Sequence, residues 1–166
     1  MHLARKIYRV VSICVTISQK TLEEVILASK INIVSFSESW DCATFTKEGM
    51  VGVVRKDPNR PVSLISLQAR QAVDQATERG LCFKKFVADI TVDCPEMPPS
   101  GALLKSGDLV LGILPERKRC WPECILLEKD MPCPLIDGVR YAWVETPGSL
   151  CLGDCLKPLE KPESTD

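Results

Sequence analysis

The strongest constraint on the fold is a series of short segments rich in valine and isoleucine, separated by frequent turn-forming residues. β-Branched side chains fit a pleated sheet, whereas Gly, Pro, Asn and Asp clusters end strands. We predict strands at residues 8–17, 32–36, 61–65, 86–92, 109–114 and 139–145. Turns are expected at residues 56–59, 95–99, 106–108, 147–149 and 153–154. This pattern favours a β-barrel or a β-sandwich.

One segment has clear helical periodicity. Its apolar residues fall on one stripe at helical spacing, and they are Ile65, Ala69, Ala72, Val73 and Ala76. Gly80 is a typical stop signal after such a segment. The pattern therefore predicts one principal helix over about 66–79. We expect a single mainly β domain over residues 1–156, followed by a flexible, solvated tail over residues 157–166.

Nine cysteines and a single histidine limit the chemistry of this chain. The histidine, His2, stands at the N-terminus, which disfavours histidine-based catalysis. With a net charge of −1, the chain lacks the excess of basic residues that a general nucleic-acid binder needs. No segment reaches the ~20 apolar residues of a membrane span, and residues 10–17 suit a strand better than a signal peptide. An odd, moderate number of cysteines indicates a reducing, cytoplasmic setting that needs no disulfide staples.

The densest chemical signal is a cysteine segment that follows three basic residues. Residues 117–124 read Arg-Lys-Arg-Cys-Trp-Pro-Glu-Cys, and Cys133 follows nine residues after Cys124. Cationic neighbours favour the thiolate, which is the nucleophile and the metal ligand. Cys120 is therefore a candidate nucleophile, and Cys124 and Cys133 are candidate resolving partners or soft-metal ligands.

Each cysteine also has a plainer interpretation. Cys14 and Cys82 stand beside apolar residues and fit a buried core position, while Cys42 and Cys94 have loop signals on both sides and no assigned role. The basic triplet alone fits a solvated strand edge. A structural zinc site is a further alternative, with the four thiolates Cys120, Cys124, Cys151 and Cys155 as ligands.

Several segments, taken in order, carry a family resemblance. They are residues 9–18, 48–52, 60–65 (Arg-Pro-Val-Ser-Leu-Ile), 86–91 (Phe-Val-Ala-Asp-Ile-Thr), 104–112, the Cys120-x3-Cys124-x8-Cys133 motif, 137–139 and 151–154. Together they resemble the MOSC domain, the C-terminal module of molybdenum-cofactor sulfurases, and in particular the small stand-alone bacterial members. The resemblance spans about residues 9–156.

The resemblance implies a mostly antiparallel β-barrel. It implies that Cys120 carries sulfur or ligates molybdenum. Our first hypothesis adds that Cys120 carries the sulfur as a persulfide and that Cys124 shares or resolves it. The resemblance also implies a molybdenum cofactor, an anionic pterin, near the barrel mouth. The residues expected to contact the cofactor are Arg55, Arg60, Arg119 and Cys133. The expected partners are a molybdoenzyme and a cysteine desulfurase or another sulfur donor.

Three departures from the family pattern stand out: one is a segment over residues 21–40 that is longer than usual, and another, the absence of an Asp and a His, leaves a second function open. Residues 52–55 read Gly-Val-Val-Arg where the family has Gly-Asp-Ala-His, and Asp89 stands where the family has Asn. The first hypothesis is sulfur carriage with sulfurtransferase-like activity, and the alternative is a non-catalytic module that delivers the cofactor or docks onto a molybdoenzyme. Pyridoxal phosphate would belong to a fused sulfurase domain, because no lysine here has a recognisable Schiff-base context.

Overall fold

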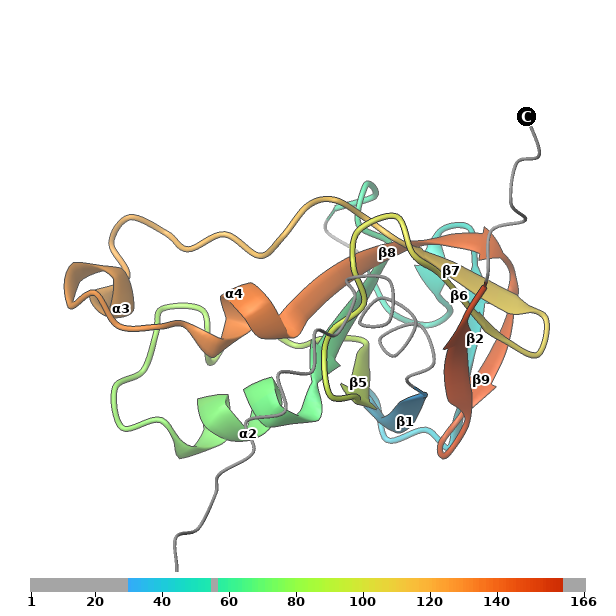
Figure 1. Ribbon diagram of the computed structural model, residues 1–166, viewed down its shortest axis with the longest axis horizontal. Helices are drawn as coiled ribbons and strands as arrows, with labels where there is room; N and C mark the ends of the chain where they lie inside the picture. Colours follow the sequence, from blue (N-terminus) through green and yellow to red (C-terminus); the bar gives the residue numbers. More distant parts are fainter. Residues whose placement is uncertain (1–29, 55–56, 160–166) are drawn as a thin grey trace, which may run out of the picture.

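A computed structural model describes residues 30–54 and 57–159, and these form a closed β-barrel with a small second sheet (Figure 1). The barrel order is β1 (Ile31–Phe36), β10 (Cys155–Pro158), β6 (Leu103–Ser106), β7 (Leu109–Ile113), β8 (Val139–Thr146), β4 (Val62–Ser66) and β5 (Ile90–Asp93). Neighbouring barrel strands are antiparallel except β4 and β5, which are parallel. The second sheet has the order β3 (Gly49–Met50), β2 (Cys42–Thr46) and β9 (Gly148–Cys151). A mainly β, mostly antiparallel barrel is thus confirmed.

Apolar side chains from alternate positions fill the barrel. In β1, Ile31 and Ile33 point inward, whereas Asn32 between them is exposed, as the two-residue period of a strand requires. The largest fully buried side chains are Phe45, Leu64, Ile90, Leu104, Leu109, Leu111, Ile113, Leu135, Leu150, Leu156, Val62 and Val92. The short apolar segments of the sequence therefore supply one continuous core.

Three helices gather at one end of the molecule (Figure 1): α2 (Leu67–Gln75), α3 (Ile125–Glu128) and α4 (Pro134–Gly138). The N-terminus of α2 is capped by Ser66, whose Oγ accepts a hydrogen bond of 3.1 Å from the N–H of Ala69. A second apolar cluster joins these helices to the outside of the barrel. Its buried members are Ile65, Ala69, Phe83, Ala88, Cys124, Leu126, Leu135, Val139 and Tyr141. This cluster is the floor of the candidate site described below.

The principal helix exists but is shorter than predicted. It ends at Gln75, and Ala76 is already extended with φ −63° and ψ 127°. Gly80 does not cap the helix. A Cβ atom at Gly80 would lie 2.9 Å from side-chain atoms of both Phe83 and Leu126, so this glycine permits close packing after the chain has left the helix.

Other boundaries also differ from the expectation. The strand predicted at 86–92 begins only at Ile90, because the N–H of Phe86 bonds the carbonyl of Cys82 in a preceding turn. Strand β10 includes Lys157 and Pro158, which extends it two residues into the predicted tail. The strand expected at 8–17 lies outside the described residues. Strands β2, β3, β6, β9 and β10 and the short helices α3 and α4 are not among the predicted elements.

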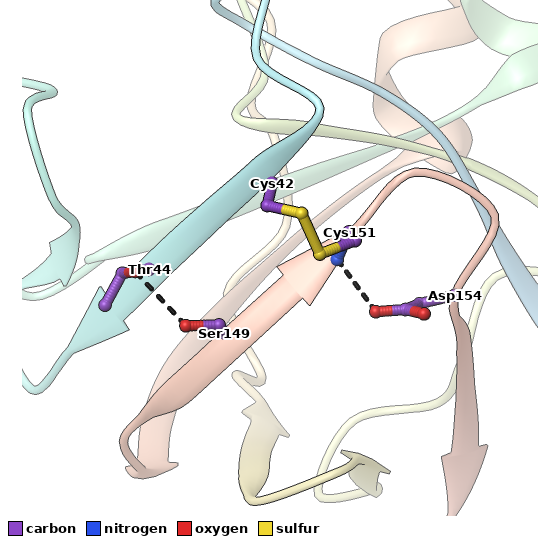
Figure 2. The surroundings of a disulfide bond; sticks show 5 residues. All are labelled: Cys42, Thr44, Ser149, Cys151 and Asp154. Atoms are coloured by element: carbon purple, nitrogen blue, oxygen red, sulfur yellow. Dashed lines mark hydrogen bonds between the residues drawn. A yellow bond between two sulfur atoms is a disulfide. The ribbon is translucent and has the colours of Figure 1, made fainter.

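A disulfide links the second sheet, contrary to the expectation of a chain without such a staple. Cys42 on β2 and Cys151 on β9 are directly opposite each other and are bonded (Figure 2). The N–H of Cys151 bonds the carboxylate of Asp154 at 2.8 Å instead of the neighbouring strand. The two cysteines therefore occupy a non-hydrogen-bonded pair, where cross-strand side chains approach most closely.

Candidate thiol site

Four cysteines from three loops come together at the helical end of the molecule. Cys82 lies between α2 and β5, and Cys120 lies in the loop after β7. Cys124 precedes α3, and Cys133 precedes α4. Cys124 is buried, whereas the other three are half-buried against the same apolar cluster. The fold thus brings together the three predicted cysteines of the 120–133 segment and adds Cys82.

Cys120 and Cys124 are neighbouring thiols that shift each other's pKa in opposite directions. Hydrogen bonds from backbone N–H groups, above all that of Leu81 with its nitrogen 3.5 Å from the sulfur, lower the pKa of Cys124 below its ordinary value. Burial raises the pKa of Cys120, and the neighbouring Cys124 acts in the same direction. Of the two thiols, Cys124 therefore loses its proton more readily than Cys120.

The side chain of Lys118 lies beside the thiols. The Nζ atom of Lys118 donates to Cys82 Sγ at 3.3 Å and to the carbonyl oxygen of Arg119 at 3.1 Å. The same ammonium lies 5.8 Å from the centre of the Phe86 ring. Lys118 is thus held against the cluster by three different groups. The expectation that the basic triplet favours a thiolate at Cys120 is wrong, because burial and the neighbouring thiols raise the pKa of Cys120.

The space between these side chains is very small. It has a volume of about 10 Å³ and is lined by Gly80, Cys82, Phe83, Lys118, Arg119, Cys120, Cys124, Cys133, Leu135 and Ile136. A volume of this size holds about one water molecule. Sites for drug-sized ligands take roughly 300–1,000 Å³. The cavity can therefore receive one additional sulfur-sized atom, but it cannot enclose a pterin.

The arginines predicted to bind the cofactor are not assembled into one cradle. Arg119 lines the cavity. Arg60 does not; its guanidinium lies 4.8 Å from the centre of the Tyr141 ring, and its Nε atom pairs with Asp57 at 3.4 Å. Arg55 lies outside the described residues. The residues present therefore do not fit the expected pterin-phosphate cradle.

The zinc alternative is wrong. Cys151, one of its four ligands, is bonded to Cys42, and the thiol of Cys155 donates instead to the side-chain oxygen of Asn32. Within residues 30–54 and 57–159, no group of three or more His, Cys, Asp or Glu side chains is arranged to hold a metal ion.

The sequence did not predict the positions of two residues near the site. Cys82, expected in the core, lines the cavity because the loop after α2 folds back over the apolar cluster; its neighbours in the sequence carry no signal of this. Asp89, which stands where the family has Asn, is buried. Its Oδ2 accepts hydrogen bonds from the N–H and the hydroxyl of Ser63 at 2.7 and 2.6 Å. This bond joins β4 to the segment before β5, so the carboxylate fulfils a structural task.

No protein-family model and no curated protein matches this chain. Among solved structures, one described only as a hypothetical protein has a TM-score of 0.56 at 13% identity, over 84% of this chain and 71% of that chain. YiiM from Escherichia coli has a TM-score of 0.53 at 13% identity, over 81% of this chain and 71% of its own. YuaD from Bacillus subtilis has a TM-score of 0.47 at 20% identity, over 77% and 93%.

These likenesses concern the fold. This chain shares the fold of YiiM over 81% of its length, and the mostly antiparallel β-barrel that the resemblance implied is present. In the part of the chain that the structure describes, we find no helix with the length and apolar character to cross a membrane.

Proposed function

We propose that this protein carries sulfane sulfur as a persulfide on Cys120, in the sulfur handling associated with the MOSC-type fold. One observation supports the proposal above all others. Four thiols meet at a cavity with room for a single sulfur-sized atom, and Lys118 and Arg119 form part of its wall. A cavity of this size suits a persulfide, whereas a metal cluster or an enclosed cofactor needs more space and more ligands.

The loading step begins with a proton transfer from Cys120 to Cys124. Cys120 passes its proton to Cys124, and the Cys120 thiolate attacks the outer sulfur of a donor persulfide, R–S–SH. A new sulfur–sulfur bond forms on Cys120, the sulfur–sulfur bond of the donor breaks, and the donor leaves as the thiolate R–S⁻. The sulfane sulfur keeps its oxidation state, so the step needs no external electrons. A cysteine desulfurase is a donor of this chemical class.

In the delivery step the outer sulfur passes from Cys120 to an acceptor, and Cys120 is now the leaving group. An acceptor nucleophile attacks the outer sulfur, and Cys120 leaves as a thiolate that recovers its proton from Cys124. The ammonium of Lys118, held on Cys82, stabilises negative charge at the cluster. A competing reaction is attack of a second cysteine thiolate on the inner sulfur of Cys120, which forms a protein disulfide and releases HS⁻.

A role in binding the molybdenum cofactor has less support. The MOSC-like fold is compatible with it, and Cys120 would provide one sulfur ligand to a metal outside the cavity. However, the cavity does not hold a pterin, and Arg60 is engaged by Asp57 and Tyr141. We therefore route no step through this cofactor. The alternative of a non-catalytic delivery or docking module predicts no persulfide on Cys120.

The test is intact-mass measurement after incubation with a cysteine desulfurase and free cysteine. The wild-type chain should gain about 32 Da, one sulfur atom, and this gain should disappear on treatment with a reductant. Cys120→Ser should not gain it, and Cys124→Ser should load more slowly because the proton acceptor is lost. Cys155→Ser, a half-buried thiol outside the cluster, is the matched control and should load like the wild type. If Cys120→Ser gains the same mass as the wild type, the proposal is wrong.

A further inference from the structure

A second thiol-containing surface lies far from the site described above. It is a groove of about 420 Å³ along β6 and β10, lined by Lys105, Ser106, Gly107, Cys155, Lys157, Pro158 and Leu159. Figure 1 shows β6 at the opposite end of the molecule from α3. The volume lies within the range of small-molecule sites, and none of these residues takes part in the proposed sulfur chemistry.

Two lysines oppose each other in this groove. Lys105 on β6 and Lys157 on β10 are direct cross-strand partners, so their side chains project from the same face. Like charges placed directly opposite each other destabilise a sheet. Among the residues of the structure that are described, neither lysine has a carboxylate within ion-pair distance, although pairs of that kind occur elsewhere on the surface. The fold therefore maintains a local positive charge that an anionic ligand would neutralise.

A free thiol stands on the same face. Cys155 precedes Lys157 by two residues, which places both side chains on one side of β10. Its Sγ donates to Oδ1 of Asn32, the opposite residue on β1, at 2.8 Å. Rotation of the Asn32 amide by half a turn would present its NH2 group to a thiolate instead. Cys155 is half-buried, and its thiol is not part of a disulfide.

We propose that this groove is a site of mixed-disulfide formation between Cys155 and small anionic disulfides of the glutathione type. The carboxylates of the ligand lie at Lys105 and Lys157 and bring its sulfur–sulfur bond to Cys155. The Cys155 thiol loses its proton to solvent, and the thiolate attacks one sulfur of R–S–S–R. The bond from Cys155 to this sulfur forms, the original sulfur–sulfur bond breaks, and R–S⁻ leaves. Cys155 is oxidised and one half of the ligand is reduced, so the ligand is itself the oxidant.

The experiment compares two disulfides of opposite charge on the full chain. Wild type is incubated with glutathione disulfide or with cystamine, and the rate of adduct formation on Cys155 is followed by peptide mass mapping. The anionic disulfide should react faster with the wild type. In Lys105→Gln/Lys157→Gln, the ratio of the anionic to the cationic rate should fall by about three- to tenfold, the effect expected for two exposed charge contacts.

A matched control removes the same charge elsewhere. Lys84→Gln/Lys85→Gln changes two exposed lysines in the loop before β5, and it should leave the rate ratio at Cys155 within about twofold of the wild type. The proposal is overturned if Cys155 forms no adduct with glutathione disulfide. It is also overturned if both double variants change the ratio equally, since overall charge would then explain the preference. Neither outcome depends on persulfide formation at Cys120.

Discussion

The Cys42–Cys151 disulfide offers a quantitative test of how the second sheet is held to the fold. The two residues are 109 positions apart in the sequence. Closing a loop of this length removes conformational entropy from the unfolded chain that corresponds to about 4.8 kcal/mol at room temperature. Small domains unfold at a cost of only about 5–15 kcal/mol. The double variant Cys42→Ser/Cys151→Ser should therefore lose about 2–5 kcal/mol of its free energy of unfolding.

The assay is urea denaturation followed by tryptophan fluorescence and circular dichroism. The matched control is Thr44→Ala/Ser149→Ala, which removes a hydrogen bond of 3.2 Å between the same two strands (Figure 2). This exposed pair should contribute less than about 1 kcal/mol. A loss in the cysteine variant no larger than that in the control would refute the argument from loop length. Persulfide loading should be unchanged, because the disulfide lies outside the cysteine cluster.

Three further predictions concern the fold. Asp89→Ala should lower the free energy of unfolding by about 3 kcal/mol in a urea titration, because two donors of Ser63 lose a buried acceptor; Asp89→Asn, which keeps one oxygen, should cost less, and equal losses would contradict this. Gly49→Ala should cost about 2–4 kcal/mol, since φ is +115° and a Cβ would lie 2.2 Å from the Pro61 carbonyl oxygen; a thermal melt like that of the wild type would exclude this clash. Burial raises the pKa of Cys94 to about 11 from 9.0, so the folded state retains this proton longer than the unfolded state, and the free energy of unfolding should fall as pH rises between these values. Cys94→Ala should flatten this part of the pH profile, and an unchanged slope would disprove the assignment.

The sequence predicts strands well where apolar residues are dense. Strands β1, β4, β7 and β8 coincide with their predicted segments to within one or two residues, because both faces or alternate positions are apolar. Strands β2 and β9 of the second sheet are short, and their pattern is weak in isolation. Their pairing places Cys42 opposite Cys151, and this register depends on contacts between residues more than a hundred positions apart. Nothing local in the sequence indicates the disulfide.

The sequence predicted only part of the candidate site, because the rest depends on contacts between residues distant in the sequence. The Cys120-x3-Cys124 spacing and the basic triplet identify the segment that forms one wall of the cavity. Its fourth thiol, Cys82, comes from the loop after α2, whose course is fixed by packing of Phe83 in the second apolar cluster. The lowered pKa of Cys124 also depends on this loop, because Leu81 supplies the main hydrogen bond. Tertiary contacts thus decide which of the two thiols has the lower pKa.

The central claim is tested most directly by locating the sulfane sulfur among the four clustered thiols. After loading with a cysteine desulfurase, the persulfide is trapped with an alkylating reagent and mapped by tandem mass spectrometry. The account predicts the trapped persulfide on Cys120, with Cys124 alkylated as an ordinary thiol. A persulfide found on Cys82 or Cys133 with none on Cys120, or no persulfide on any of the four, would contradict it.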